Sequence, residues 1–243
     1  MNGVRVVVNF VQKNPHMGLS VVLFTIGIIA LCTNIPTLAG ALFGAGASLL
    51  GAWVTEMNNR RANAEDKIKR ESDARRYFAP ELHRIVERVL YIHDRAIPNF
   101  TCALMEDGVK PTDLQEDFIP YMPVLYPNAV QFKDLSGDDA IALIAFYDSL
   151  HDLEKFVNEW WEREGQLPAN IFNMVLHHAT DSLTLAEVCI ERFELEKLFP
   201  PKYESWGTLT SRIERSKNSA LASREHHTTN PQKIPTQVYP AKS

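Results

Sequence analysis

The chain has 243 residues, of which 45% are hydrophobic and 23% are charged, and its formal net charge is −5. These averages are typical of a folded protein and exclude a disordered or collagen-like chain. The charge changes sign along the sequence: it is +1 over residues 1–57, +3 over 58–76, −13 over 77–208 and +4 over 209–243. An acidic body of this size repels nucleic acid, so we expect no nucleic-acid partner.

The three cysteines, Cys32, Cys102 and Cys189, are far apart and form no CxxC pair. This spacing argues against a disulfide framework and a zinc ribbon, and it indicates a reduced, cytosolic body. The sequence also lacks the glycine-rich nucleotide loops, the serine-hydrolase elbow and the zinc-protease motif. We therefore expect no cofactor and assign no catalytic residue.

Residues 14–55 form a run of 42 residues without Asp, Glu, Lys or Arg. As one helix this run would extend roughly 63 Å, about twice the hydrocarbon core of a bilayer. Asn34, Ile35 and Pro36 lie near its middle, where proline disfavours helix at the preceding residue and Asn suits a turn. The sequence therefore predicts a transmembrane helical hairpin over 17–55, with spans near 17–33 and 37–55.

Basic residues flank both ends of this run, whereas the connecting turn carries no charge. They are Arg5 and Lys13 before it and Arg60, Arg61, Lys67, Lys69 and Arg70 after it. Since cytoplasmic flanks are enriched in Lys and Arg, we expect both termini to be cytoplasmic, with a short N-terminal segment 1–16 and the cell (inner) membrane as location.

Other interpretations of the run are weaker. A cleaved signal peptide would have a long basic region and would leave a second apolar segment behind it. A buried soluble hairpin would need enclosure on all sides. A hairpin that enters the bilayer without crossing it stays open, because the first span is short.

Small residues recur every four positions in the second span, at Gly40, Gly44, Ser48 and Ala52. Such a stripe lets another helix approach closely. Two interpretations are open: the stripe packs against the first span near Gly27, or it joins several copies into a homo-oligomer. The second leads to an alternative function, a pore or membrane-disrupting effector.

Residues 56–78 are rich in charge and predict a solvated helical stalk. Acid-to-base pairs four residues apart, such as Glu65 with Lys69 and Asp66 with Arg70, support an exposed helix.

Residues 79–208 show three amphipathic helical patterns, which predict an antiparallel bundle and an all-α fold. The first runs from Pro80 to near Pro98, the second starts at Ser136, and the third runs from Pro168 to Pro200. Cys189 lies near the apolar face of the third helix and is expected in the core. The apolar positions are Leu82, Ile85, Val86, Val89 and Leu90 in the first helix, Leu143, Phe146, Leu150, Leu153, Val157 and Trp160 in the second, and Phe172, Leu176, Ala179, Leu183, Ala186, Ile190 and Phe193 in the third. We expect one or two short helices in 98–135 and a mostly disordered tail over 209–243, in which a short helical continuation to about Ala222 stays open. Trp160 and Trp161 could anchor a partner or pack in the core, and His226 and His227 are interpreted as solvated.

A set of His and Asp residues is the only candidate for chemistry. Adjacent His and Asp on facing helices can hold a divalent metal that activates water. The alternative, which we favour, is that these histidines border the bundle and bind water or a neighbouring side chain. The candidate metal ligands are His93, Asp94, His151, Asp152, His177, His178 and Asp181.

Together these patterns predict an integral membrane protein with a cytoplasmic helical domain and a non-enzymatic role in protein interaction or regulation. Its expected partners are the lipid bilayer, a second copy of the chain and an unidentified protein. The alternatives are the oligomeric pore or effector and a membrane-tethered His/Asp metal-dependent hydrolase.

Overall fold

The computed structural model describes residues 15–103, 115–162 and 171–229. No strand occurs in these ranges, and their helices pack as a bundle, which confirms the all-α class. In chain order the elements are α2 (Pro15–Cys32), α3 (Pro36–Ala103), α4 (Gln115–Phe118), η2 (Val130–Asp134), α5 (Gly137–Glu162), α6 (Ile171–Arg192), α7 (Leu195–Leu198), η3 (Glu204–Trp206) and α8 (Leu209–Thr229). The chain divides into an N-terminal unit, 1–69, and a C-terminal unit, 70–243, with the boundary inside α3.

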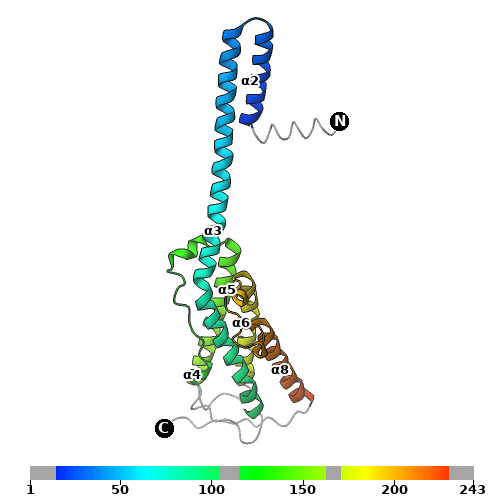
Figure 1. The fold of residues 1–243 in the computed structure, drawn as a ribbon. Coiled ribbons are helices and arrows are strands. Elements are labelled where there is room, and N and C mark those ends of the chain that lie inside the picture. The colour runs from blue at the N-terminus through cyan, green and yellow to red at the C-terminus, as the bar shows by residue number, and fades with distance from the viewer. Residues whose placement is uncertain (1–14, 104–114, 163–170, 230–243) are drawn as a thin grey trace. The chain divides into compact units, whose positions relative to one another are not determined.

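The N-terminal unit is a helical hairpin in which α2 lies beside the first part of α3 (Figure 1). The turn falls at residues 33–35, where Asn34 adopts the left-handed conformation with φ 61°. Asn tolerates this conformation better than most residues, and Pro36 then opens the second helix, where its missing N–H costs nothing. The break therefore lies where the sequence predicts it.

Small residues let the two helices of the hairpin approach each other. The Ser20 hydroxyl donates to the Gly46 carbonyl at 2.7 Å. The Phe24 ring lies on Gly46 and the Phe43 ring lies on Gly27, with 5.9 Å between the two ring centroids. A Cβ at Gly27 would come within 2.9 Å of Phe43, so this contact requires glycine or a shift of the ring.

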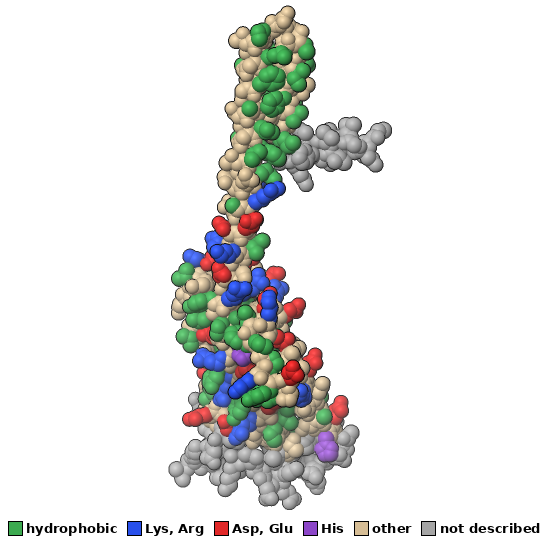
Figure 2. Space-filling view, viewed as in Figure 1, with side chains coloured by type: hydrophobic (Ala, Val, Ile, Leu, Met, Phe, Trp, Pro, Cys, Tyr) green, Lys and Arg blue, Asp and Glu red, His purple; other side chains and the backbone are tan. Residues whose placement is uncertain are grey.

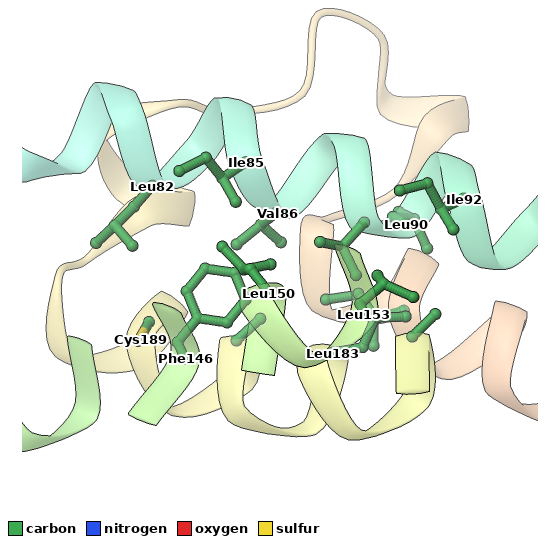
Figure 3. Packing of buried hydrophobic residues seen from close by; sticks show 14 of the residues in the cluster. Leu82, Ile85, Val86, Leu90, Ile92, Phe146, Leu150, Leu153, Leu183 and Cys189 are labelled. Atoms are coloured by element: carbon green, nitrogen blue, oxygen red, sulfur yellow. The ribbon is translucent and has the colours of Figure 1, made fainter. Parts of the chain in front are cut away.

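The C-terminal unit surrounds a core made by the second part of α3 together with α5 and α6 (Figure 3). The helices α5 and α6 are antiparallel, because the Cys189 thiol meets the Ala142 carbonyl at 3.5 Å and the Ser182 hydroxyl meets the Ser149 carbonyl at 3.3 Å. The predicted apolar positions with described side chains on all three helices are buried, as Leu82, Leu150 and Leu183 illustrate. The spacing of apolar residues thus identified this core.

The predicted boundary between a stalk and a bundle at residue 79 is absent from the structure. Instead α3 is continuous through Pro80 and Pro98. Ala74 and Phe78 are fully buried and extend the apolar face that contains Leu82. Packing on both sides of Pro80 outweighs the cost of proline inside the helix. The packed domain therefore begins before residue 79.

Residues 115–135 contain the short helical pieces α4 and η2, in agreement with the expectation of one or two short helices. Polar contacts hold this segment on α3. Arg88 donates from Nε to the Ile119 carbonyl at 3.0 Å, and the Glu81 carboxylate accepts from the backbone N–H groups of Val124 and Leu125, both at about 3 Å.

The segment that starts at residue 209 is helical, which agrees with the alternative of a short helix and not with a mostly disordered tail. It forms α8, which packs on the C-terminal unit through Leu209, Ile213 and Ala220. Its buried seam continues with Ser216, so large apolar residues mark only its beginning. The helix extends beyond Ala222, the limit of the short helix that the sequence left open. Residues 230–243 lie outside the described ranges.

Candidate functional site

The C-terminal unit contains a cavity of about 1010 Å³ between α3, residues 196–208 and α8. We call it the α3–α8 cavity. Its lining combines the aromatic rings of Phe199 and Trp206 with the ion pair of Glu87 and Arg212. A concave surface with a few polar groups among apolar ones is the usual form of a binding site.

Residues 199–207 form one wall of the cavity. Pro200 and Pro201 prevent the chain from continuing as a helix after α7, and Gly207 has φ +76°, which favours glycine. The Trp206 side chain is 52% exposed, and its ring packs edge-on against the Tyr203 ring at 5.0 Å. Exposed Trp and Tyr side chains are the ones that most often anchor a protein partner.

Where α3 meets this wall, the His83 ring lies against the Phe199 ring with 4.6 Å between centroids. Burial lowers the pKa of His83, Glu87 opposes that effect, and Arg212 adds to it. Beside it Arg212 binds Glu87 with two hydrogen bonds, at 2.5 and 2.9 Å, which join α8 to α3. Such two-point pairs are the strongest surface ion pairs.

The buried His93 lies next to this cavity and connects three helices. Its Nδ1 is 2.7 Å from the Ser216 hydroxyl of α8, and its Nε2 is 3.0 Å from the Thr180 hydroxyl of α6. The Thr180 hydroxyl also donates to the Leu176 carbonyl, so this contact belongs to a chain of polar groups. Ser216 also contacts the Asp94 carboxylate, and both residues line the cavity.

Burial is the main cause that lowers the pKa of His93 to about 4, and the cations of Arg224 and Lys217 add to it. The imidazole is therefore neutral near pH 7. Because Ser216 and Thr180 occupy its two nitrogens, His93 acts as a polar junction between α3, α6 and α8.

The seven candidate metal ligands do not come together in one centre. His151 is 3.9 Å from Glu154, and His177 is 3.6 Å from Asp181, each pair on one helix. The His178 ring lies against Phe156 at 4.9 Å, and Asp152 is exposed. Among the described residues no group of three or more His, Cys, Asp or Glu side chains is arranged to hold a metal ion.

Only His93 and Asp94 of those seven belong to the site, and their partners are hydroxyls. Ser216, Thr180 and Arg212 follow no catalytic motif, so no sequence pattern marks them as residues of the site. Cys189 lies in the core as expected, and burial raises the pKa of its thiol to about 12, so it is unreactive. The side chains of Cys102, Trp160, Trp161 and His227 lie outside the described residues.

The small-residue stripe of α3 lies on the surface of the N-terminal unit. A Cβ added at Gly40 or Gly44 would meet no atom within 4 Å, and Ser48 and Ala52 are exposed. The interpretation that this stripe packs against α2 is therefore wrong, since Gly27 of α2 contacts Phe43 instead.

No protein-family model matches the sequence, and comparisons with curated proteins and with solved structures gave no match.

Proposed function

We propose that the protein is an integral membrane protein whose hairpin crosses the bilayer and whose C-terminal unit binds a protein partner in the cytoplasm. The observation that supports this most strongly is the surface of the hairpin. Its outward apolar side chains, such as Val22 and Ile28, are 50% and 57% exposed, whereas the C-terminal unit encloses its own core. An exposed apolar surface of this kind is stable in lipid and unfavourable in water.

Length and composition support the same proposal. Within the described ranges, one helix, Pro36–Thr101, is long and apolar enough to cross a membrane, and His16–Cys32 is a shorter apolar helix. Figure 2 shows hydrophobic side chains along the hairpin, with the charged side chains beginning beyond it. Arg60 and Arg61 follow the apolar run. If the hairpin crosses the cell (inner) membrane with both termini in the cytoplasm, these two arginines lie on the cytoplasmic side, where Lys and Arg are favoured.

The interaction role is supported by the C-terminal unit. Residues 77–208 carry a net charge of −13, and Tyr203 and Trp206 present exposed rings beside a large cavity. A basic partner would be attracted by the charge and anchored by the rings.

Membrane insertion is tested by placing arginine in the middle of α2. Val22→Arg should release much of the full-length protein from membranes washed with alkaline carbonate, because arginine at a span centre costs about 3 kcal/mol. In wild-type inside-out vesicles, added protease should digest the C-terminal unit, and in sealed right-side-out vesicles it should not.

Ile68→Arg is the matched control, since Ile68 is 65% exposed but lies after the basic residues that end the apolar run. It should leave the membrane fraction unchanged. Equal membrane retention of the Val22→Arg and wild-type chains would contradict insertion, and digestion of the C-terminal unit in sealed right-side-out vesicles would contradict the orientation.

A second candidate function is assembly through the exposed stripe of α3, which would give the oligomer needed for a pore or membrane-disrupting effector. Gly44→Leu should reduce the oligomer seen by crosslinking in detergent, because leucine blocks close approach of two backbones. Ala45→Leu, at an exposed small residue outside the stripe, should leave it unchanged. A wild-type chain that is monomeric, or an oligomer unaffected by Gly44→Leu, would exclude this assembly.

A further inference from the structure

The helix α8 is held on the C-terminal unit mostly by polar contacts. Its buried seam begins with Leu209 and Ile213 and then continues with the small residues Ser216 and Ala220. Near its end the Ser223 hydroxyl is 3.0 Å from the Thr101 hydroxyl of α3. A helix that buries so few large apolar side chains gains little from the hydrophobic effect, which dominates the packing of α3, α5 and α6.

Cations of α8 face acidic or amide groups on both helices beneath it. On the side of α3, Arg212 binds Glu87. On the side of α6, Lys217 is 3.0 Å from Glu187, and Arg224 donates to the Asn173 side-chain oxygen at 2.9 Å. Residues 209–229 carry a net charge of +2 opposite a body of −13. Charge complementarity therefore positions α8.

The connection that carries α8 is suited to a change in direction. It contains Pro200, Pro201 and Gly207, and only the three-residue η3 interrupts its irregular backbone. Hinges are commonly a few such residues that absorb a change in backbone angles.

We propose that α8 is a displaceable strap, and that the face of α3 and α6 beneath it is a docking site for a basic amphipathic helix of a partner protein. The face is marked by Glu87 on α3 and Glu187 on α6, and His93 of α3 contacts Thr180 of α6. The chemistry of the partner follows from α8 itself, which occupies this face with apolar residues at its start, small residues along its seam and a cation toward each carboxylate.

Displacement is governed by competition. While α8 is docked, a free helix must compete with one that is tethered and therefore present at a high effective concentration. Weakening the ion pairs of α8 opens the face, so a partner helix then binds more tightly. The proposal rests on the interaction role proposed above, and it requires no particular orientation in the membrane.

The test uses the full-length protein in detergent and a fluorescent peptide with the sequence of residues 209–229. Amide hydrogen exchange should be at least tenfold faster in α8 than in α5 and α6, which reports local opening. Arg212→Glu should accelerate exchange in α8 by about another tenfold and tighten peptide binding to a similar extent, since one partly buried two-point ion pair is lost. Asn218→Glu, which places a negative charge at an exposed position of α8, should change neither.

Charge reversal on the docking face completes the test. Glu87→Arg should abolish binding of the wild-type peptide, and a peptide carrying Arg212→Glu should bind this variant. In the full-length chain that carries both Glu87→Arg and Arg212→Glu, amide hydrogen exchange in α8 should return toward that of wild type. The proposal is overturned if amide hydrogen exchange is as slow in α8 as in α5 and α6. It is also overturned if the affinity of the peptide does not depend on the charge at position 87. These readouts are independent of Val22→Arg, so a failure of the strap and a failure of membrane insertion are distinguishable.

Discussion

Replacing Glu81 with alanine is expected to lower the free energy of unfolding of the C-terminal unit by about 3 kcal/mol. The Glu81 carboxylate is buried and accepts hydrogen bonds from the Val124 and Leu125 N–H groups and from the Tyr147 hydroxyl at 3.2 Å. Alanine would leave the buried Tyr147 hydroxyl without its acceptor, together with the partly buried hydrogen bonds of the Val124 and Leu125 N–H groups. Chemical denaturation of the full-length protein in detergent, followed by helical circular dichroism, measures the change.

Two further variants separate this network from a general effect of losing a charge. Burial and then Glu81 raise the pKa of Tyr147, so its phenol stays protonated and donates to Glu81. Tyr147→Phe removes one of the three donors and should cost about 1 kcal/mol. Glu214→Ala, at an exposed position of α8, should change stability by less than about 0.5 kcal/mol. A Glu81→Ala variant as stable as Glu214→Ala would show that the network contributes nothing.

Acidification is expected to destabilise the C-terminal unit through His93. The folded state holds the pKa of His93 near 4, below its ordinary value of 6.5, because the buried imidazole resists protonation. The unfolded chain therefore takes up the proton first as pH falls. The stabilisation is complete above about pH 6.5 and is lost progressively down to about pH 4, a change of about 3 kcal/mol.

His93→Asn tests this assignment, because its amide can still reach Ser216 but does not titrate. The variant should be less stable than wild type near neutral pH, and the loss of stability between about pH 6.5 and 4 should shrink. His177→Asn, at an exposed histidine beside Asp181, should retain the pH dependence of wild type. If His93→Asn and wild type lose stability in parallel as pH falls, another group is responsible.

The sequence by itself determined the hairpin and the centre of the bundle. The uncharged run and the Asn34–Pro36 break located α2 and the start of α3, because glycine, proline and charge act locally. The apolar spacing that includes Leu143, Phe146 and Leu150 identified the buried face of α5, since only one face of a helix can meet the core.

Only the tertiary structure decided the continuity of α3, the extent and packing of α8 and the role of His93. Packing of Phe78 and Leu82 on the core overrides the helix-breaking tendency of Pro80, and propensity cannot reveal that contact. Ser216 belongs to a buried seam because His93 and Asp94, more than 120 residues away in the chain, supply its partners. Local pattern reports where a chain forms helices, whereas polar contacts between distant residues depend on which helices become neighbours.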